Sequence, residues 1–456
     1  MRLAQPLSVL GRICALIVVL GMVACASAAP TPTPKLGTPI ATVQNQATPP
    51  PVELVIWSEL FVVGKMVDDP NGMGRYGTYL KQQFEKEHPG VTIKFEYHGF
   101  DEELRQNLVT ALRVGNAPDI VVGENYFQQY AELQALTPLD DVVADIKSNL
   151  IPGTYRAAES DNHIYGLSAF TGVFGFERNC KVIQATGLNC DQPPRTWKEL
   201  SDQVKTITQK GNSKYYGYSL QGPVGFAVGS VFRIALFMAQ SGASLCKNNC
   251  TDPYFNNPKA IPVLEFIREL NRSTPPGLTF NPDEEQVYSQ LFQGISAYQI
   301  AGSWHPKWAK DSGCEDCRYS SVPLPDGGKS ASMVVGNVIY VVLKSSKHRD
   351  IAAQWVKFLA RDDVQDLVYP VLGRLPSTKS ALMRLRPNVN SANQAFIDEL
   401  LNDSELSILP QWRKEPQQLW TIYNDMLKQV LTTEQPIQSI IDQAQVKADA
   451  VMQQKP

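Results

Sequence analysis

The chain has 456 residues, of which 43% are hydrophobic and 19% charged, and its formal net charge at pH 7 is −3. This near-neutral balance, without a basic stripe, gives no support to a nucleic-acid partner. A chain of this length exceeds what one hydrophobic core usually serves, so we expect more than one globular lobe.

The N-terminus has the pattern of a secretory signal. Arg2 and Arg12 supply positive charge, and an apolar run from Ile13 to Val23 follows. The run is shorter than the roughly twenty apolar residues that a membrane-spanning helix needs. We therefore predict a signal peptide over residues 1–24.

A tract rich in Pro, Thr and Ala extends from Cys25 to Pro51 and predicts a semi-rigid linker. The sequence MVAC at 22–25 resembles the bacterial lipobox, in which the cysteine is lipidated. That resemblance implies a lipid anchor at Cys25, on the outer face of the cell membrane, since several acyl chains hold a protein on a bilayer. We find no second long apolar segment that would attach the chain.

Six further cysteines fall into three near-neighbour couples, which in an exported chain predicts disulfides. The alternative is a four-cysteine zinc site built from CKNNC and CEDC. Oxidising conditions and local pairing favour bridges, so no metal is expected. The predicted couples are Cys180 with Cys190, Cys246 with Cys250, and Cys314 with Cys317.

From Val52 onward, strand and helix patterns alternate. In the first predicted helix Tyr76, Leu80 and Phe84 share one face. The β-α-β-α-β order predicts an α/β lobe with a largely parallel sheet, whose ligands lie at the carboxyl ends of the strands. The strand patterns occupy residues 52–57, 91–97 and 118–122, and the helix patterns occupy residues 75–90 and 101–115.

The remainder of the chain is predicted to be richer in helices. A strongly amphipathic helix is expected over residues 349–369. Other helices are expected over 195–211, 229–242, 259–273, 415–431 and 436–452, and strands over 216–220, 297–302 and 332–344.

Several segments together resemble the extracellular solute-binding proteins of ABC sugar importers, a family that includes maltose-binding proteins. They occur in the family's order and read YLKQQFEKEHPGVTIKF, ALRVGNAPDIV, QALTPLDDVV, YGLSAFTGVFGFERN, PPRTWKELSDQ, AGSWHPKWA and SSKHRDIAAQWVKFLARDDVQ. The resemblance implies a two-lobed α/β fold of the type II periplasmic-binding class, with a ligand cleft between the lobes. Crossing segments would form the hinge near Phe170, Gly336 and Arg374.

The resemblance also implies boundaries and a role. Lobe 1 would comprise residues 52–170 plus 336–373, and lobe 2 residues 171–335 plus 374–456. The protein would be a monomer without a cofactor that captures a mono- or oligosaccharide and delivers it to ABC permease subunits in the membrane. Closure of the lobes on the ligand would be the signal that the permease reads.

A sugar presents hydroxyls at its edge and an apolar C–H face, so its site needs aromatic rings and polar side chains. Trp304 in AGSWH resembles the family's stacking tryptophan, and His305 beside it is expected to be a bystander. Core packing remains the alternative for Trp304 and for Trp57, and helix capping for Asn125. The full set of expected ligand-binding residues is Trp57, Glu59, Glu124, Asn125, Phe170, Gln221, Trp304, Asn337, Arg374 and Trp412.

Three alternatives remain. A carbohydrate-active enzyme would need two paired carboxylates, which the sequence can supply, but it has no G-x-S-x-G or H-E-x-x-H motif. The sequence GMGRYG at 72–77 matches a dinucleotide-binding pattern, yet no strand directly precedes it, so a loop at the cleft rim is expected. The same fold could also bind a non-sugar solute.

Overall fold

The structure of the protein is a computed structural model. It describes residues 51–58, 73–99, 102–123, 127–156, 158–224, 228–328, 338–402 and 412–453. The predicted signal peptide and Cys25 lie outside these ranges. Within these ranges no helix combines the length and the apolar character needed to cross a membrane.

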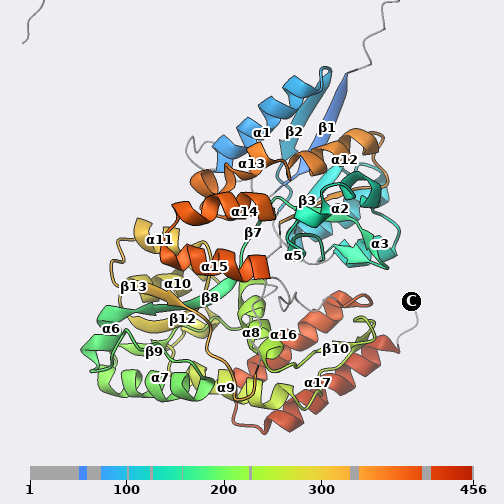
Figure 1. Ribbon diagram of the computed structural model, residues 1–456. Coiled ribbons are helices and arrows are strands. Elements are labelled where there is room, and N and C mark those ends of the chain that lie inside the picture. The colour runs from blue at the N-terminus through green and yellow to red at the C-terminus, as the bar shows by residue number, and fades with distance from the viewer. Residues whose placement is uncertain are drawn as a thin grey trace, which may run out of the picture. The chain divides into compact units, whose positions relative to one another are not determined.

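Two separate sheets organise the described residues (Figure 1). The first has five strands in the order β2-β1-β3-β14-β6. β1 is parallel to β2 and β3, whereas β14 runs antiparallel to both of its neighbours. The expected largely parallel sheet is therefore present, with one reversed strand. The bounds are β1 Val52–Trp57, β2 Val91–Glu96, β3 Ile120–Gly123, β6 Gly166–Ser168 and β14 Ile339–Val342.

Alternating side chains give the first sheet two buried faces. Leu54 and Ile56 of β1 pack into the same core as Phe84 of α1 (Met73–Glu87), whereas Trp57 packs with Leu108 of α2 (Glu102–Val114). This follows from the two-residue period of a strand, which sends successive side chains to opposite faces. Helices α1 and α12 (Arg349–Phe358) therefore cover one face and α2 covers the other. We call this sheet with its helices the first lobe.

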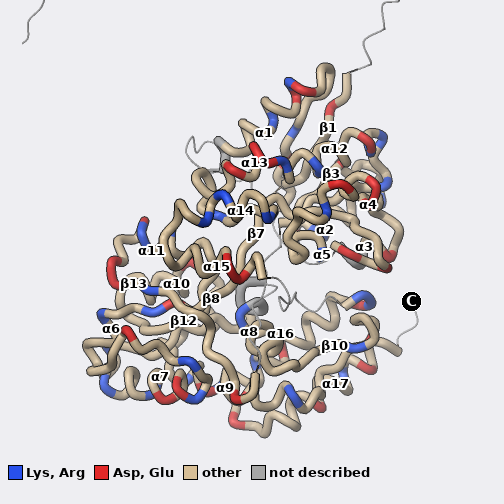
Figure 2. The backbone as a smooth tube through the Cα atoms, in the orientation of Figure 1, with Lys and Arg blue, Asp and Glu red and all other residues tan. Residues whose placement is uncertain are grey.

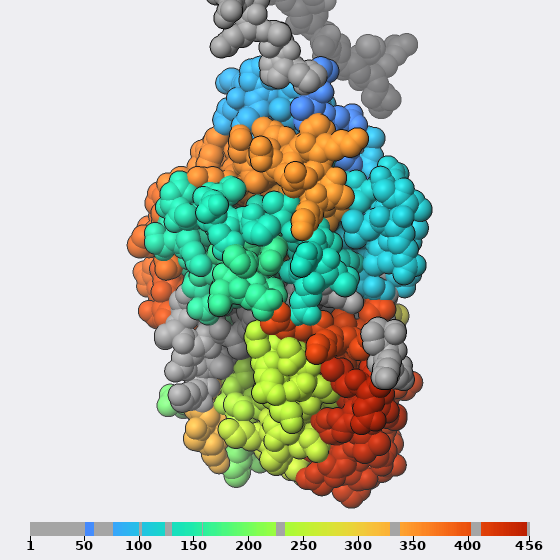
Figure 3. Space-filling view, turned by 90° about the vertical axis from the view of Figure 1, so that its right-hand side faces the viewer, coloured from blue at the N-terminus to red at the C-terminus, as the bar shows by residue number. Residues whose placement is uncertain are grey.

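The second sheet has four strands in the order β13-β8-β12-β9. β8 pairs antiparallel with β12 and β13, and β12 pairs parallel with β9. Its core is one continuous apolar cluster shared with α7, α8, α9, α16 and α17, and we call this assembly the second lobe. In Figure 3 the C-terminal helices, in red, cover its flank. The bounds are β8 Phe174–Asn179, β9 Tyr216–Tyr218, β12 Ser296–Gly302 and β13 Cys317–Ser320.

A short ribbon forms between the two sheets. The chain leaves β6 in the first sheet, passes through β7 (Phe170–Thr171) and enters β8 in the second. β7 pairs antiparallel with β15 (Leu375–Pro376). The segments expected to cross near Phe170 and Arg374 thus lie side by side, whereas Gly336 lies outside the described residues. Two further pairs are β4 Glu159–Ser160 with β5 His163–Ile164, and β10 Cys246–Lys247 with β11 Asp252–Pro253.

The helices largely follow the predicted apolar periodicity, and side chains cap several of them. The Thr196 hydroxyl accepts a hydrogen bond from the Glu199 backbone N–H at the start of α7. The α-helix bounds are α1 Met73–Glu87, α2 Glu102–Val114, α3 Phe127–Glu132, α4 Asp140–Val143, α5 Gly153–Arg156, α6 Cys180–Ala185, α7 Trp197–Gly211, α8 Val228–Gln240, α9 Ala260–Arg272, α10 Glu284–Phe292, α11 His305–Asp311, α12 Arg349–Phe358, α13 Asp362–Gln365, α14 Lys379–Leu385, α15 Ser391–Asn402, α16 Pro416–Thr432 and α17 Ile437–Met452.

Two predicted elements differ in the structure. The single helix expected over 349–369 is broken, because Arg361 has an extended backbone and α13 begins anew at Asp362. The loop expected at GMGRYG is also wrong: Met73 to Gly77 form the first turns of α1, so two of the three glycines are helical. Basic and acidic residues are interspersed along the described backbone (Figure 2).

Candidate functional site

Three of the predicted ligand residues come together beside the ribbon that links the lobes. Arg374 directly precedes β15, and Phe170 lies in the paired strand β7. The guanidinium carbon of Arg374 lies 4.3 Å from the centroid of the Trp304 ring and 5.7 Å from that of Phe170. The ring of Trp308, a residue that the sequence did not single out, lies 5.9 Å away. Aromatic rings thus surround one cation at the junction of the lobes.

Glycine backbones fix the position of the Trp304 indole. A Cβ atom at Gly172 would lie 2.9 Å from the ring, and one at Gly302 would overlap it. The edge of the indole also meets Phe174, with the ring centroids 5.8 Å apart. Trp304 is 9% exposed, so it belongs partly to the core of the second lobe. A ligand that stacks on the face occupied by Arg374 has to displace the guanidinium.

A largely buried polar network lies directly beside Trp304. The ring Nδ1 of His305 is 2.9 Å from Oε2 of Glu177, and both side chains are completely buried. The same carboxylate accepts hydrogen bonds from the Gln299 amide at 2.8 Å and the Tyr319 hydroxyl at 2.5 Å. Burial lowers the pKa of His305, although the bond to Glu177 opposes that shift. His305 is therefore neutral at pH 7 and ties α11, the helix that follows Trp304, to β8.

Gln221 lies in a second buried polar group of the second lobe. Its Oε1 accepts a hydrogen bond of 2.8 Å from Arg233, whose guanidinium also bonds Glu284 at 3.1 Å. Burial lowers the pKa of Arg233, and its guanidinium lies 4.3 Å from the centroid of the Tyr288 ring. The Gln221 amide nitrogen has no hydrogen-bond partner among the described residues. The prediction of a ligand contact at Gln221 is not tested by this arrangement.

Trp57 is the last residue of β1, and its side chain contacts other residues of the first lobe. Its Nε1 donates to Oε2 of Glu96 at 3.1 Å, and its ring stacks on His98 with centroids 3.8 Å apart. Glu96 also pairs with Lys94, and that hydrogen bond is the main cause of its lowered pKa. This is the packing role that the sequence left open for Trp57, and a ligand contact by the same ring stays a prediction.

Trp412 is buried in the core of the second lobe, where its ring centroid lies 5.4 Å from that of Phe255. The next residue, Arg413, was not predicted, yet it makes ion pairs with Glu132 and Asp161 in the first lobe. The one feature of the sequence that could have pointed to Arg413 is its position next to the candidate Trp412.

The remaining predicted ligand residues, Glu59, Glu124, Asn125 and Asn337, lie outside the described residues. β1 and β3 are parallel neighbours, with Trp57 opposite Val121, so their carboxyl ends meet at the same edge of the first sheet. Glu59 and Glu124 follow these two ends in the sequence. Their contribution to a ligand site therefore stays a prediction.

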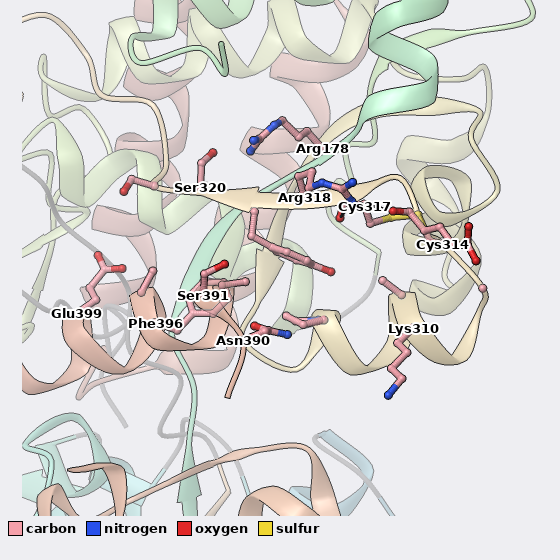
Figure 4. Close-up of a pocket in the computed structure, with 18 residues that line it drawn as sticks. Arg178, Lys310, Cys314, Cys317, Arg318, Ser320, Asn390, Ser391, Phe396 and Glu399 are labelled. Atoms are coloured by element: carbon pink, nitrogen blue, oxygen red, sulfur yellow. Dashed lines mark hydrogen bonds between the residues drawn. A yellow bond between two sulfur atoms is a disulfide. The ribbon is translucent and has the colours of Figure 1, made fainter. Parts of the chain in front are cut away.

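A separate pocket of about 750 Å³ lies in the second lobe among β13, α11 and α15 (Figure 4). None of the predicted ligand residues lines it. Arg178, Lys310 and Arg318 are among its lining residues, together with Glu315 and Glu399. Its lining therefore mixes charges of both signs, and burial raises the pKa of Glu399 to about 7.

The six candidate cysteines form the three disulfides predicted from their spacing, Cys180–Cys190, Cys246–Cys250 and Cys314–Cys317. Because these thiols are bonded to one another, the alternative four-cysteine zinc site is excluded. Among the described residues, no cluster of His, Cys, Asp and Glu has a metal-binding arrangement.

The sequence signature of bacterial extracellular solute-binding proteins matches residues 71–366, which is more than half of the chain. The chain belongs to this family. This match confirms the family resemblance expected from the sequence. It also confirms the expected two-lobed α/β fold and the expected place outside the cytoplasm.

Relatives within the solute-binding family differ in what they bind. The sn-glycerol-3-phosphate-binding periplasmic protein UgpB of Pectobacterium atrosepticum is 22% identical over 413 residues, covering 83% of this chain and 88% of that protein. The GacH receptor of Streptomyces glaucescens, solved without ligand and with acarbose, has a TM-score of 0.69 at 18% identity, covering 89% of this chain and 100% of that one. The maltose/maltodextrin-binding domain MalE of Bdellovibrio bacteriovorus, bound to maltotriose, has a TM-score of 0.66 at 21% identity, with 88% and 100% covered.

Proposed function

We propose that this solute-binding protein captures a mono- or oligosaccharide outside the cytoplasm and presents it to the permease subunits of an ABC importer. The observation that carries the proposal is the group of Trp304, Phe170 and Arg374 at the ribbon between the lobes. Aromatic rings suit the C–H face of a sugar, and a guanidinium donates strong hydrogen bonds to its hydroxyls. Structural relatives with acarbose and maltotriose support the same class of ligand.

A second candidate is a small phosphorylated or carboxylated solute. Arg374 favours it, since a guanidinium binds anions in a bidentate manner. The UgpB relative, named for sn-glycerol 3-phosphate, supports this candidate. The surrounding rings favour the sugar, because a phosphate has no apolar face to stack on them.

A thermal-shift panel separates the two candidates. Glucose, maltose, maltotriose, mannotriose, cellobiose and sn-glycerol 3-phosphate are added singly to the purified full chain. A ligand at one hundred times its Kd stabilises the folded state by ~2.7 kcal/mol, which gives a clear shift in Tm. A shift with a neutral sugar supports the proposal, whereas a shift with the phosphate alone contradicts it in favour of the second candidate.

We also propose that the mature protein starts at a lipidated Cys25 and stands off the membrane on the linker of residues 25–51, as a monomer. Support comes from the lipobox-like sequence and from three disulfides, which suit an oxidising compartment. The lobe boundaries given above belong to the same proposal. Cys25→Ser is expected to move the protein from the membrane fraction to the soluble exported fraction, and an unchanged membrane fraction would refute the anchor.

We propose binding rather than catalysis, because the chain belongs to a solute-binding family. Each sugar that shifts Tm is then incubated with the protein. We expect the sugar to be recovered chemically unchanged. Release of hydrolysis products, lost on substitution of one carboxylate, would instead identify an enzyme.

A further inference from the structure

One arginine bridges the two lobes at a point away from the ribbon. Nη2 of Arg413 lies 2.9 Å from Oδ1 of Asp161 and 3.2 Å from the hydroxyl oxygen of Ser160. Its Nε donates to Oε1 of Glu132. The Arg413 side chain is only 12% exposed, although it carries a full charge. One guanidinium therefore satisfies two carboxylates and a hydroxyl.

The three acceptors belong to the first lobe. Glu132 ends α3, whose Tyr130 and Ala131 are buried in the same core cluster as Trp57. Ser160 ends β4, and Asp161 follows it in the turn to β5. The acceptors are thus fixed to helices and strands that pack on the first sheet.

The backbone of Arg413 is instead held by the second lobe. Its N–H donates to the carbonyl oxygen of Cys250 at 3.1 Å, and Nε1 of the preceding Trp412 donates to that of Leu245 at 3.4 Å. Cys250 is bonded to Cys246, the residue after Leu245, so the disulfide links the two short segments that carry these carbonyls. A disulfide-closed loop and a buried indole therefore form the platform from which the guanidinium extends to the first lobe.

Every polar contact of this guanidinium that we describe is made across the lobes, so it breaks when α3 and the Cys246–Cys250 loop separate. We propose that Arg413 is a positioning residue that clamps the two lobes in their ligand-binding arrangement. The clamp rests on the proposed function, because its purpose is to favour the arrangement in which both lobes contact the solute. If only a fraction of the molecules has the ligand-binding arrangement, the apparent Kd equals the intrinsic Kd divided by that fraction.

The clamp has a signature that distinguishes it from a ligand contact. Asp161 is 71% exposed, so salt screens its pairing with Arg413. A neutral sugar has no charge for salt to screen. Salt-dependent affinity for a neutral sugar, present in the wild type and absent without Arg413, therefore reports on the clamp.

The first experiment needs no ligand, so its failure is distinct from failure of the proposed function. Spin labels are placed on p-acetylphenylalanine introduced at Val114 of α2 and Val446 of α17, which are 72% and 69% exposed, leaving the native disulfides intact. Inter-label distances are measured by pulsed electron resonance in the full chain. Arg413→Gln is expected to broaden the distribution and shift it relative to the wild type, whereas Arg413→Lys is expected to shift it less.

Arg386→Gln is the matched control, because it breaks the pair between Arg386, which directly follows α14, and Asp398 of α15, only 12 positions away in the sequence. It is expected to leave the distances unchanged. Once Arg413 is replaced, adding Glu132→Gln and Asp161→Asn is expected to have no further effect. Distances that are identical in the wild type and Arg413→Gln would overturn the clamp, as would an equal shift in Arg386→Gln.

The second experiment uses maltotriose, or whichever neutral sugar of the panel shifts Tm. Arg413→Gln is expected to raise its Kd about tenfold, the size of effect expected for a partly buried, multiply bonded arginine. It is also expected to abolish the salt dependence. A Kd that rises in Arg413→Gln with the salt dependence retained would show a direct ligand contact and would overturn the clamp.

Discussion

The guanidinium of Arg374 stacks over the indole of Trp304, with 4.3 Å between its central carbon and the ring centroid. The two residues are separated by 70 positions in the sequence, and they meet because β15 pairs with β7 beside the start of α11. A cation over an indole is attracted by the negative face of the ring. The pair thus places a strong hydrogen-bond donor and an aromatic surface together at the junction of the lobes.

Arg374→Ala is expected to raise the Kd for the bound sugar by about 10- to 100-fold, since a hydrogen bond to a charged group contributes roughly 1.5–3 kcal/mol. Arg374→Lys keeps the charge but loses the planar fork, so it is expected to recover only part of the affinity. Isothermal titration calorimetry measures both. An affinity that is unchanged in Arg374→Ala would remove this residue from the site.

Gly302→Ala is expected to move the Trp304 ring, because the new methyl group would overlap the indole. The expected result is a cost of about 1–3 kcal/mol in the free energy of unfolding, as for other overpacked cores, together with weaker sugar binding. Trp304→Phe removes the overlapping atoms, so the double variant is expected to cost less than the sum of the two single variants. Additive costs, measured by urea unfolding, would mean that the glycine does not position the indole.

Glu177→Ala is expected to destabilise the second lobe by about 3–5 kcal/mol, because it leaves buried donors of His305, Gln299 and Tyr319 without their shared acceptor. Glu177→Gln has the same shape and retains one acceptor oxygen, so a smaller loss is expected. Urea unfolding compares the two. Equal losses would show that volume, rather than hydrogen bonding, decides the effect.

The buried His305 ring is expected to make the free energy of unfolding decrease at acidic pH. Burial lowers its pKa in the folded state, so near pH 6.5 the unfolded chain binds a proton at this position more strongly than the folded protein does. The free energy of unfolding is therefore expected to fall as pH decreases below about 6.5, by up to ~1.4 kcal/mol per pH unit from this group.

Unfolding curves at several pH values, for the wild type and His305→Asn, measure this dependence. His163→Asn is the control, since that ring is 56% exposed and pairs only with Asp140 among the contacts we describe. It is expected to keep the wild-type slope, whereas His305→Asn is expected to flatten it. The reverse pattern would assign the slope to the surface histidine.

Local features of this fold could be predicted from the sequence because their causes are local. The spacing of Tyr76, Leu80 and Phe84 predicted the buried face of α1, and all three are buried. Close spacing likewise predicted the disulfide couples. The end of α12 was missed, since no proline or glycine marks it and the chain turns at Arg361, which pairs with Asp363 and with Glu87 of α1.

The features that could not be predicted from the sequence are mostly contacts between segments that lie far apart in the chain. The partner of His305 could not be predicted, because the ring is fully buried against Glu177, 128 positions away. Arg413 reaches acceptors more than 250 positions away, and its role depends on how the lobes meet. No periodicity or motif reports such pairings, because they arise only when the topology has brought the segments together.

Calorimetric titration of Trp304→Ala and of Trp420→Leu with the neutral sugar that most raises Tm decides whether the Trp304 ring binds the sugar. Trp420 lies in α16, where it is partly buried against the apolar core of the second lobe, and it is the matched tryptophan control. The proposed sugar-binding role predicts saturable binding by the wild type, affinity at least about tenfold weaker in Trp304→Ala, and wild-type affinity in Trp420→Leu. Wild-type affinity in Trp304→Ala, or no binding of any neutral sugar by the wild type, would contradict it.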